Sequence, residues 1–299
     1  MTLLTEAASP PEAGANVIYL TWEQYLAWLA GKLKQARNAA GVMVKLPPAW
    51  VPGDHGAFIA PTGEGKTTHA VGVLGLRKWV LALDAKGEDE TLTASGYIRV
   101  RELPADGWRA AVNRLRDKGD QRAWKEIYER IDAGQPARVI VGGAAHNDRE
   151  DDKLRKLMRE AITFCRHSEG WTLYVDEFEL LSSQRMFHLG PPVERMLITA
   201  RRAKTSVITS YQAQAWVSSH AHRQAKQVTM WQTGSRQMIK NIAEGMGRDW
   251  RQLAEVIDLL PKWHSVTIPR GTHDPMVITR APKLPDKRQK PVSSRDAGR

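Results

Sequence analysis

The stretch FIAPTGEGKTTHAVGVL, residues 58–74, decides the fold of this 299-residue chain. An apolar run ends at Ile59, a turn built from proline and glycine follows, and Lys-Thr-Thr opens a segment of helical character. Gly63 and Gly65 allow the tight curvature that lets successive backbone N–H groups point at one anion. A lysine and a hydroxyl directly after such a loop suit a phosphate chain with its magnesium ion. The stretch therefore predicts a phosphate-binding loop between a strand and a helix.

The positions of this loop have distinct expected roles. Lys66 reaches the β- and γ-phosphates, and the Thr67 hydroxyl ligates Mg²⁺. The helix that follows presents its positive N-terminal end to the same phosphates. Ala60 stands where the usual pattern begins with glycine, and we interpret this small change as tolerated. The alternative is an ordinary strand-to-helix loop with a solvated lysine. The residues expected to bind ATP are Ala60, Pro61, Thr62, Gly63, Glu64, Gly65, Lys66, Thr67 and Thr68.

A second apolar run, WTLYVDE at residues 171–177, ends in two acids, Asp176 and Glu177. An aspartate at the tip of a buried strand can hold Mg²⁺, directly or through water. A glutamate directly after it can polarise the attacking water as a general base. The pair is typical of a hydrolase, whereas the alternative is two surface carboxylates that close a strand. Asp84, which ends the run KWVLALD, competes for the metal role but lacks an acidic neighbour.

A third strand, TSVITSYQ at residues 205–212, ends in Gln212. An amide at that tip can contact both the γ-phosphate and the attacking water, and so report hydrolysis to the rest of the protein. Arg201 and Arg202 lie just before this strand. An arginine near a neighbouring subunit's γ-phosphate would stabilise transition-state charge as a finger. The alternative for each arginine is a surface ion pair.

Composition and charge bound the class of protein. Hydrophobic residues make up 42% and charged residues 26% of the chain, as in a globular protein. The net charge of +11 favours a polyanionic partner such as nucleic acid, with solubility as the alternative reason. The single cysteine, Cys165, excludes an intramolecular disulfide. Because no run of 18 apolar residues occurs, we expect no membrane-spanning helix.

The chain divides into three expected parts. Residues 1–45 are expected to hold a flexible leader and an amphipathic helix over 21–40, and residues 46–282 an ATPase domain. Residues 283–299 form a basic, proline-containing tail that we expect to be disordered. Within the middle part, strands alternate with helices. This alternation predicts an α/β fold, with a mainly parallel sheet covered by helices on both faces.

Four motifs in this order resemble those of the FtsK/HerA superfamily of P-loop DNA-translocating ATPases: APTGEGKTT, VLALDAKGEDE, LYVDEFELL and ARRAKTSVITSYQ. The superfamily includes chromosome pumps, conjugative coupling proteins and the packaging ATPases of some membrane-containing viruses. The resemblance spans about residues 55 to 280. It implies a RecA-like P-loop NTPase fold of the additional-strand, catalytic-glutamate type, and an Mg²⁺-dependent ATPase.

The resemblance also implies roles for single positions. By this resemblance Lys66 would contact the phosphates, and Thr67 and Asp176 would bind Mg²⁺. Glu177 would be the general base, Gln212 the sensor and Arg202 the arginine finger. The chain departs from the family pattern before the sensor, where Ser210-Tyr211 replaces a small residue followed by threonine. A homo-oligomeric ring around DNA, usually a hexamer, is the assembly that the resemblance implies.

We therefore expect an ATP-driven motor that packages or transfers DNA. The expected partner is double-stranded DNA bound with weak sequence selectivity, and a portal or membrane partner is left open. The expected location is cytoplasmic, or virion-associated if the protein is viral. A second reading is a morphogenesis or secretion ATPase that acts on protein at a membrane. Glu177 beside Asp176 disfavours a third reading, a nucleotide switch with little turnover.

Overall fold

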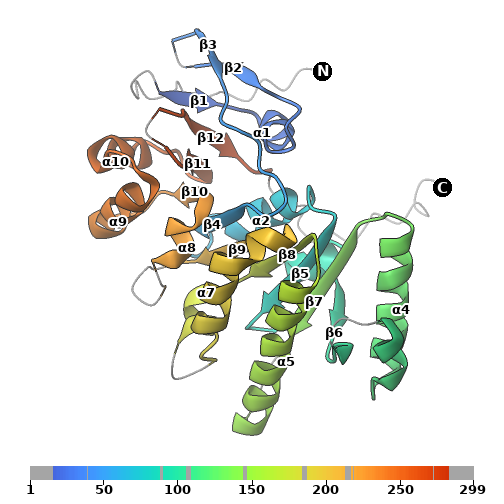
Figure 1. Cartoon of the computed structure of the whole chain (residues 1–299). Coiled ribbons are helices and arrows are strands. Elements are labelled where there is room, and N and C mark those ends of the chain that lie inside the picture. Colours follow the sequence, from blue (N-terminus) through green and yellow to red (C-terminus); the bar gives the residue numbers. More distant parts are fainter. Residues whose placement is uncertain are drawn as a thin grey trace, which may run out of the picture.

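A ten-stranded sheet runs through the described part of the chain (Figure 1). The computed structural model describes residues 16–282, except 39, 88–89, 106–108, 144–146, 184–186, 213–216, 218 and 272. The expected leader and tail, residues 1–15 and 283–299, therefore lie outside the described residues. The strands are β1 (Val17–Tyr19), β2 (Gln35–Arg37), β3 (Met43–Lys45), β4 (His55–Ile59), β5 (Trp79–Asp84), β6 (Ile98–Val100), β7 (Ala137–Gly142), β8 (Trp171–Val175), β9 (Ser206–Tyr211), β10 (Ala225–Trp231), β11 (His264–Pro269) and β12 (Met276–Arg280).

Helices connect most of these strands. They are α1 (Trp22–Leu29), α2 (Lys66–Leu74), α3 (Glu90–Ala94), α4 (Lys118–Asp132), α5 (Asp148–His167), α6 (Phe178–Ser182), α7 (Gly190–Thr199), α8 (His220–Arg223), α9 (Arg236–Met246), α10 (Trp250–Asp258) and the 3₁₀ helices η2 (Arg109–Arg114) and η3 (Ala200–Ala203). None of the helices in the described part of the chain is long and apolar enough to cross a bilayer.

The sheet is mainly parallel, as the alternation of strands and helices predicted. Its order is β1-β12-β11-β10-β4-β9-β8-β5-β7-β6. From β10 to β6 all neighbouring strands are parallel, while β11 pairs antiparallel with both β10 and β12. Every residue of β4, β8 and β9 is buried, as expected for parallel strands that are covered on both faces.

Two apolar layers cover the two faces of the sheet. Alternate strand residues point to opposite faces, so Leu81 and Leu83 belong to one layer and Val80 and Ala82 to the other. The first layer contains side chains of α4, α5, α7, α9 and α10, and the second contains side chains of α1, α2 and α3. Helices therefore pack on both faces, as the sequence predicted.

The N-terminal segment differs from the helix expected over 21–40. Helix α1 has the expected capping box between Thr21 and Gln24, but it ends at Leu29, and Gly31 follows with a φ of 74°. The next residues form the β2–β3 hairpin, which stands at the top of Figure 1. The helical pattern ends there because the backbone pairs across the hairpin instead. In addition, β1 pairs with β12, so the sheet includes residues before position 46.

Candidate active site

The phosphate loop leaves the tip of β4 and enters α2, as predicted. Gly63 and Gly65 have φ angles of 84° and 86°, in the left-handed region that glycine adopts without strain. A Cβ at either position would meet nothing within 4 Å, so the requirement for glycine is conformational. No side chain caps the N-terminus of α2. Its first backbone N–H groups are therefore available to an anion.

Lys66 is the cation at the start of α2. The residue is only 8% exposed, and its Nζ is buried without a hydrogen-bond partner among the described residues. A buried ammonium is costly unless opposite charge or hydrogen-bond acceptors compensate it. An incoming phosphate group supplies both. The position of this lysine thus suits the phosphate contact predicted for it.

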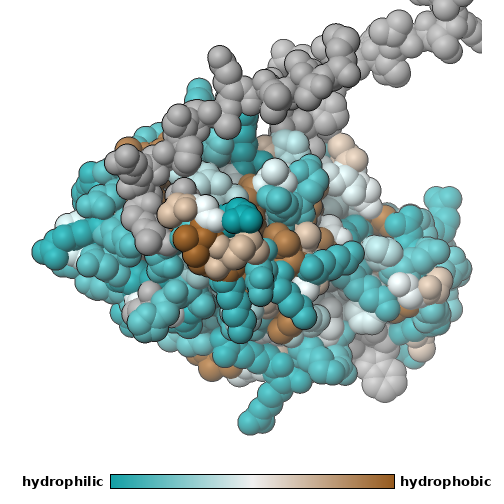
Figure 2. All heavy atoms as spheres, turned by 90° about the horizontal axis from the view of Figure 1, so that it is seen from above, coloured by the Kyte–Doolittle hydropathy of each residue, from teal (hydrophilic) through white to brown (hydrophobic). Residues whose placement is uncertain are grey.

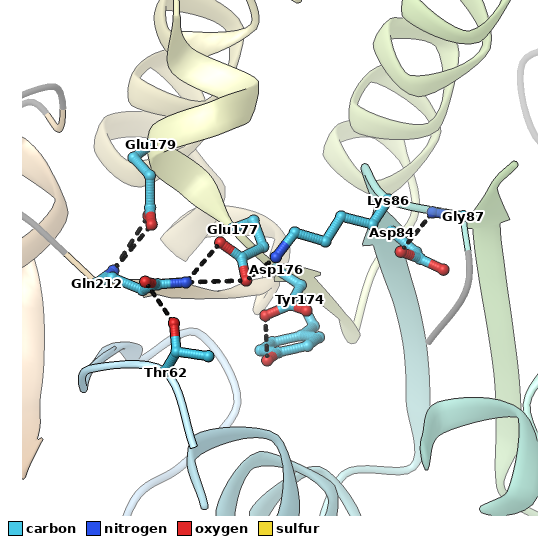
Figure 3. Close-up of polar contacts among 9 residues, drawn as sticks. All are labelled: Thr62, Asp84, Lys86, Gly87, Tyr174, Asp176, Glu177, Glu179 and Gln212. Atoms are coloured by element: carbon cyan, nitrogen blue, oxygen red, sulfur yellow. Dashed lines mark hydrogen bonds and ion pairs between the residues drawn. The ribbon is translucent and has the colours of Figure 1, made fainter. Parts of the chain in front are cut away.

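The tips of three neighbouring strands meet at the loop, because β9 lies between β4 and β8. Gln212, which follows β9, accepts a hydrogen bond from the Thr62 hydroxyl (2.8 Å) through its Oε1 (Figure 3). Its Nε2 donates to both carboxylate oxygens of Glu177, at 3.3 and 3.2 Å. Its backbone N–H donates to the carboxylate of Glu179, at 3.1 and 3.2 Å. One amide side chain therefore joins the phosphate loop to the acid predicted as the base.

Glu177 itself has an unusual backbone and a strong cationic partner. Its φ of 47° is in the left-handed region, which is uncommon for a residue with a side chain and recurs at functional sites. Lys86, which follows β5, donates to its Oε1 at 2.8 Å. Burial acts to raise the pKa of Glu177, but the hydrogen bond from Lys86 and the charge of Lys66 outweigh it and lower the pKa. The carboxylate is therefore ionised at neutral pH, as a general base must be.

The two candidate metal carboxylates differ in their surroundings. Asp176 directly follows β8, is buried, and accepts a hydrogen bond from the Tyr174 hydroxyl at 3.0 Å. Asp84 accepts from the Gly87 backbone at 2.9 Å and from the Arg99 guanidinium at 3.2 Å. Because Asp84 stabilises its own loop and pairs with an arginine, Asp176 is the better candidate for Mg²⁺.

The donor set around the loop also fits magnesium. The described residues contain no group of three or more His, Cys, Asp or Glu side chains that could hold a metal ion. Mg²⁺ is usually bound by one or two protein oxygens, with substrate phosphates and waters completing the shell. The Thr67 hydroxyl at the start of α2 and the Asp176 carboxylate would supply those protein oxygens.

Arg202 lies away from this group of residues. It sits in η3, before β9 begins, whereas Gln212 follows the end of the same strand. Six strand residues at about 3.3 Å each separate the two ends of β9, so Arg202 lies at the opposite end of this strand from the loop. It is exposed, and within one chain it does not reach the phosphate loop.

Two residues that contact the candidate site were not predicted from the sequence. Lys86 pairs with Glu177, and Glu179 holds the Gln212 backbone. Lys86 lies two residues after Asp84 in the motif VLALDAKGEDE, and Glu179 lies two residues after Glu177 in the motif LYVDEFELL. This closeness in sequence was the available signal. Their contacts depend on strand order, which those motifs do not contain.

The chain matches no protein-family model and no curated protein, but its fold matches solved structures. VirB4 of Thermoanaerobacter pseudethanolicus superposes with a TM-score of 0.53 at 11% identity, covering 83% of this chain and 96% of that one. The genome packaging NTPase B204 from Sulfolobus turreted icosahedral virus 2, in complex with AMPPCP, superposes with a TM-score of 0.50 at 15% identity, covering 78% and 100%. These matches confirm the predicted RecA-like P-loop NTPase fold, and they confirm the resemblance to FtsK/HerA-type ATPases at the level of the fold.

Proposed function

We propose that this protein is an Mg²⁺-dependent ATPase that moves DNA, in packaging or in transfer. The observation that supports ATP hydrolysis is the series of hydrogen bonds from Thr62 through Gln212 to Glu177 beside the phosphate loop. A loop that only bound phosphate would not need an ionised carboxylate tied to it. A hydrolase needs both.

The chemistry follows from the placement of these side chains. Lys66 and the first N–H groups of α2 would hold the β- and γ-phosphates, with Thr67 and Asp176 at the metal, which would neutralise developing charge. Glu177 would accept a proton from the attacking water. Its present contacts to Lys86 and Gln212 hold it in place beside the loop. Gln212 would transmit loss of the γ-phosphate, because it touches the loop and the base at once.

DNA is the proposed substrate because of charge. The chain carries 44 lysine and arginine residues against 33 aspartate and glutamate residues. The face shown in Figure 2 is mostly hydrophilic, with apolar residues gathered only in small groups. It is the net charge of +11 that suits a polyanion contacted through its phosphates. The similarity in fold to a viral genome packaging NTPase agrees with this substrate. A motor that acts on protein at a membrane is the competing proposal.

The test is the ATPase rate of the full chain with and without DNA. Double-stranded DNA of unrelated sequences should stimulate the wild type to similar extents and should bind less tightly as salt rises. Lys66→Ala should bind no ATP and show no turnover, since it removes the buried ammonium that faces the phosphates. ATP hydrolysis without any DNA binding or stimulation would favour the protein-directed motor. Unchanged ATP affinity in Lys66→Ala would contradict the nucleotide site itself.

A further inference from the structure

A cavity of about 270 Å³ adjoins the phosphate loop on the side away from Glu177. Its walls come from the loop and the start of α2 on one side and from the ends of β10, β11 and β12 on the other. It is lined by Gly63, Glu64, Gly65, Thr68, Trp231, Trp263, Arg280, Ala281 and Pro282. Its volume is slightly below the roughly 300 Å³ at which small-molecule pockets begin, so it suits part of a nucleotide and not a whole one.

Sheet topology explains why these residues meet there. β10 runs parallel to β4, so Trp231 at its end lies at the same edge as the loop. β11 is antiparallel to both β10 and β12, and its register pairs Ser265 with Trp231 on β10 and His264 with Arg280 on β12. Trp263, which directly precedes β11, is thereby brought to the same edge. Residues about 200 positions apart in sequence form one pocket with the loop.

The pocket offers flat surfaces instead of a dense set of hydrogen-bonding groups. Trp231 is almost fully buried, while Trp263 is 43% exposed. The Trp263 ring has the Lys262 ammonium 5.0 Å and the Arg280 guanidinium 5.5 Å from its centroid. Its backbone has a φ of 64°, which is uncommon for a bulky aromatic residue and recurs at ligand clamps. An exposed indole beside a planar guanidinium is a surface on which a nucleobase stacks.

We propose that this pocket binds the base and ribose of the nucleotide whose phosphates lie in the loop. The inference rests on the proposed nucleotide binding and adds where the base goes and how it is recognised. Thr68 lies one residue beyond Thr67 and lines the pocket, so the ligand can pass from loop to pocket without a break. Because stacking depends on ring area more than on hydrogen-bonding edges, purine nucleotides should bind tighter than pyrimidine nucleotides, with little difference between adenine and guanine.

The experiment compares two ligands on the full-length protein. ADP engages loop and pocket, whereas inorganic tripolyphosphate engages the loop alone. Trp263→Ala should lower the affinity for ADP about tenfold, the order of effect expected from loss of one base–aromatic stack. Its affinity for tripolyphosphate should stay unchanged, which also shows that the variant is folded. Trp263→Phe should retain part of the ADP affinity. Leu259→Ala serves as the control, since Leu259 is exposed nearby but does not line the pocket.

The outcomes separate the pocket from the nucleotide site. Equal weakening of ADP and tripolyphosphate in Trp263→Ala, or no weakening of either, would overturn the base pocket while leaving the nucleotide site intact. Wild-type affinity for UDP equal to that for ADP would also overturn it. A wild-type protein that binds neither ligand would overturn the proposed ATPase, and the pocket with it. Selective loss of ADP affinity, with purines favoured, is the result that supports the inference.

Discussion

Glu177 is the residue on which ATP hydrolysis depends in the proposed mechanism. Its carboxylate is fixed from two sides, by Lys86 at 2.8 Å and by the Gln212 amide at 3.2 Å. The lysine ion pair is partly solvated, since the Lys86 side chain is 60% exposed. We expect such a pair to contribute little to folding stability. Its effect is on the position and ionisation of the base.

Glu177→Gln should leave ATP binding nearly unchanged and slow hydrolysis by roughly 10²- to 10⁴-fold, the usual contribution of a general base. The amide has almost the same shape but cannot accept the proton of the water. Single-turnover hydrolysis and an independent ATP Kd measure the two effects. Glu169→Gln is the matched control, because Glu169 is an exposed acid paired with Lys204. A rate near that of the wild type would mean that another acid is the base.

Helix α2, which begins at the phosphate loop, packs closely against the N-terminal helix α1 where Gly72 meets the Trp22 ring. A Cβ on Gly72 would lie 2.3 Å from the Trp22 ring. That ring stacks on Tyr25 with centroids 5.5 Å apart and meets His69 edge-on at 5.0 Å. Burial lowers the pKa of His69 to about 3, so its ring is neutral within this cluster. The orientation of α2, and with it the loop, depends on this packing.

Gly72→Ala should lower the free energy of unfolding. Alanine gains about 1 kcal/mol in helix propensity over glycine, but overpacking against Trp22 costs about 1–3 kcal/mol and displaces α1. Urea unfolding of Gly72→Ala measures the net effect. The same change in a Trp22→Ala background removes the clash and should be neutral or stabilising. Higher stability of Gly72→Ala in the wild-type background would show that α1 and α2 are not held at this distance.

At the scale of the whole molecule, the position of Arg202 bears on assembly. It lies at the ends of the strands opposite to the phosphate loop, so it can approach a γ-phosphate only in another subunit. This placement is compatible with the proposed ring, in which each site is completed by a neighbour.

Arg202→Ala should bind ATP normally and lose turnover by about 10³-fold or more, the effect of removing an arginine finger. Mixing it with Lys66→Ala subunits should restore part of the activity, because some interfaces then pair an intact loop with an intact arginine. Lys204→Ala, which removes another exposed cation next to η3, should keep full turnover. If the mixture stays inactive while both variants assemble, Arg202 does not act in trans and the ring proposal loses its support.

The sequence by itself determined the phosphate loop and the class of fold. The left-handed glycines at 63 and 65, the lysine at 66 and the helix behind them are properties of one continuous stretch, set by local backbone geometry. The alternation of apolar strands with helices likewise predicted the parallel sheet, because strand burial on both faces leaves a continuous apolar run in each strand.

Tertiary structure alone decided which strand tips stand beside the loop. In sequence, Asp84 and Asp176 each end an apolar run, and only the acidic neighbour Glu177 favours Asp176. The order β4-β9-β8-β5 places Gln212 against Glu177 and leaves Asp84 one strand further away, paired with Arg99. Strand order is fixed by non-local packing and hydrogen bonding, which no local pattern encodes. The helix expected over 21–40 was too long for the same reason, because part of that segment pairs as a hairpin. The pocket beside the loop likewise exists only because antiparallel β11 and β12 bring Trp263 and Arg280 back to the edge where β4 ends.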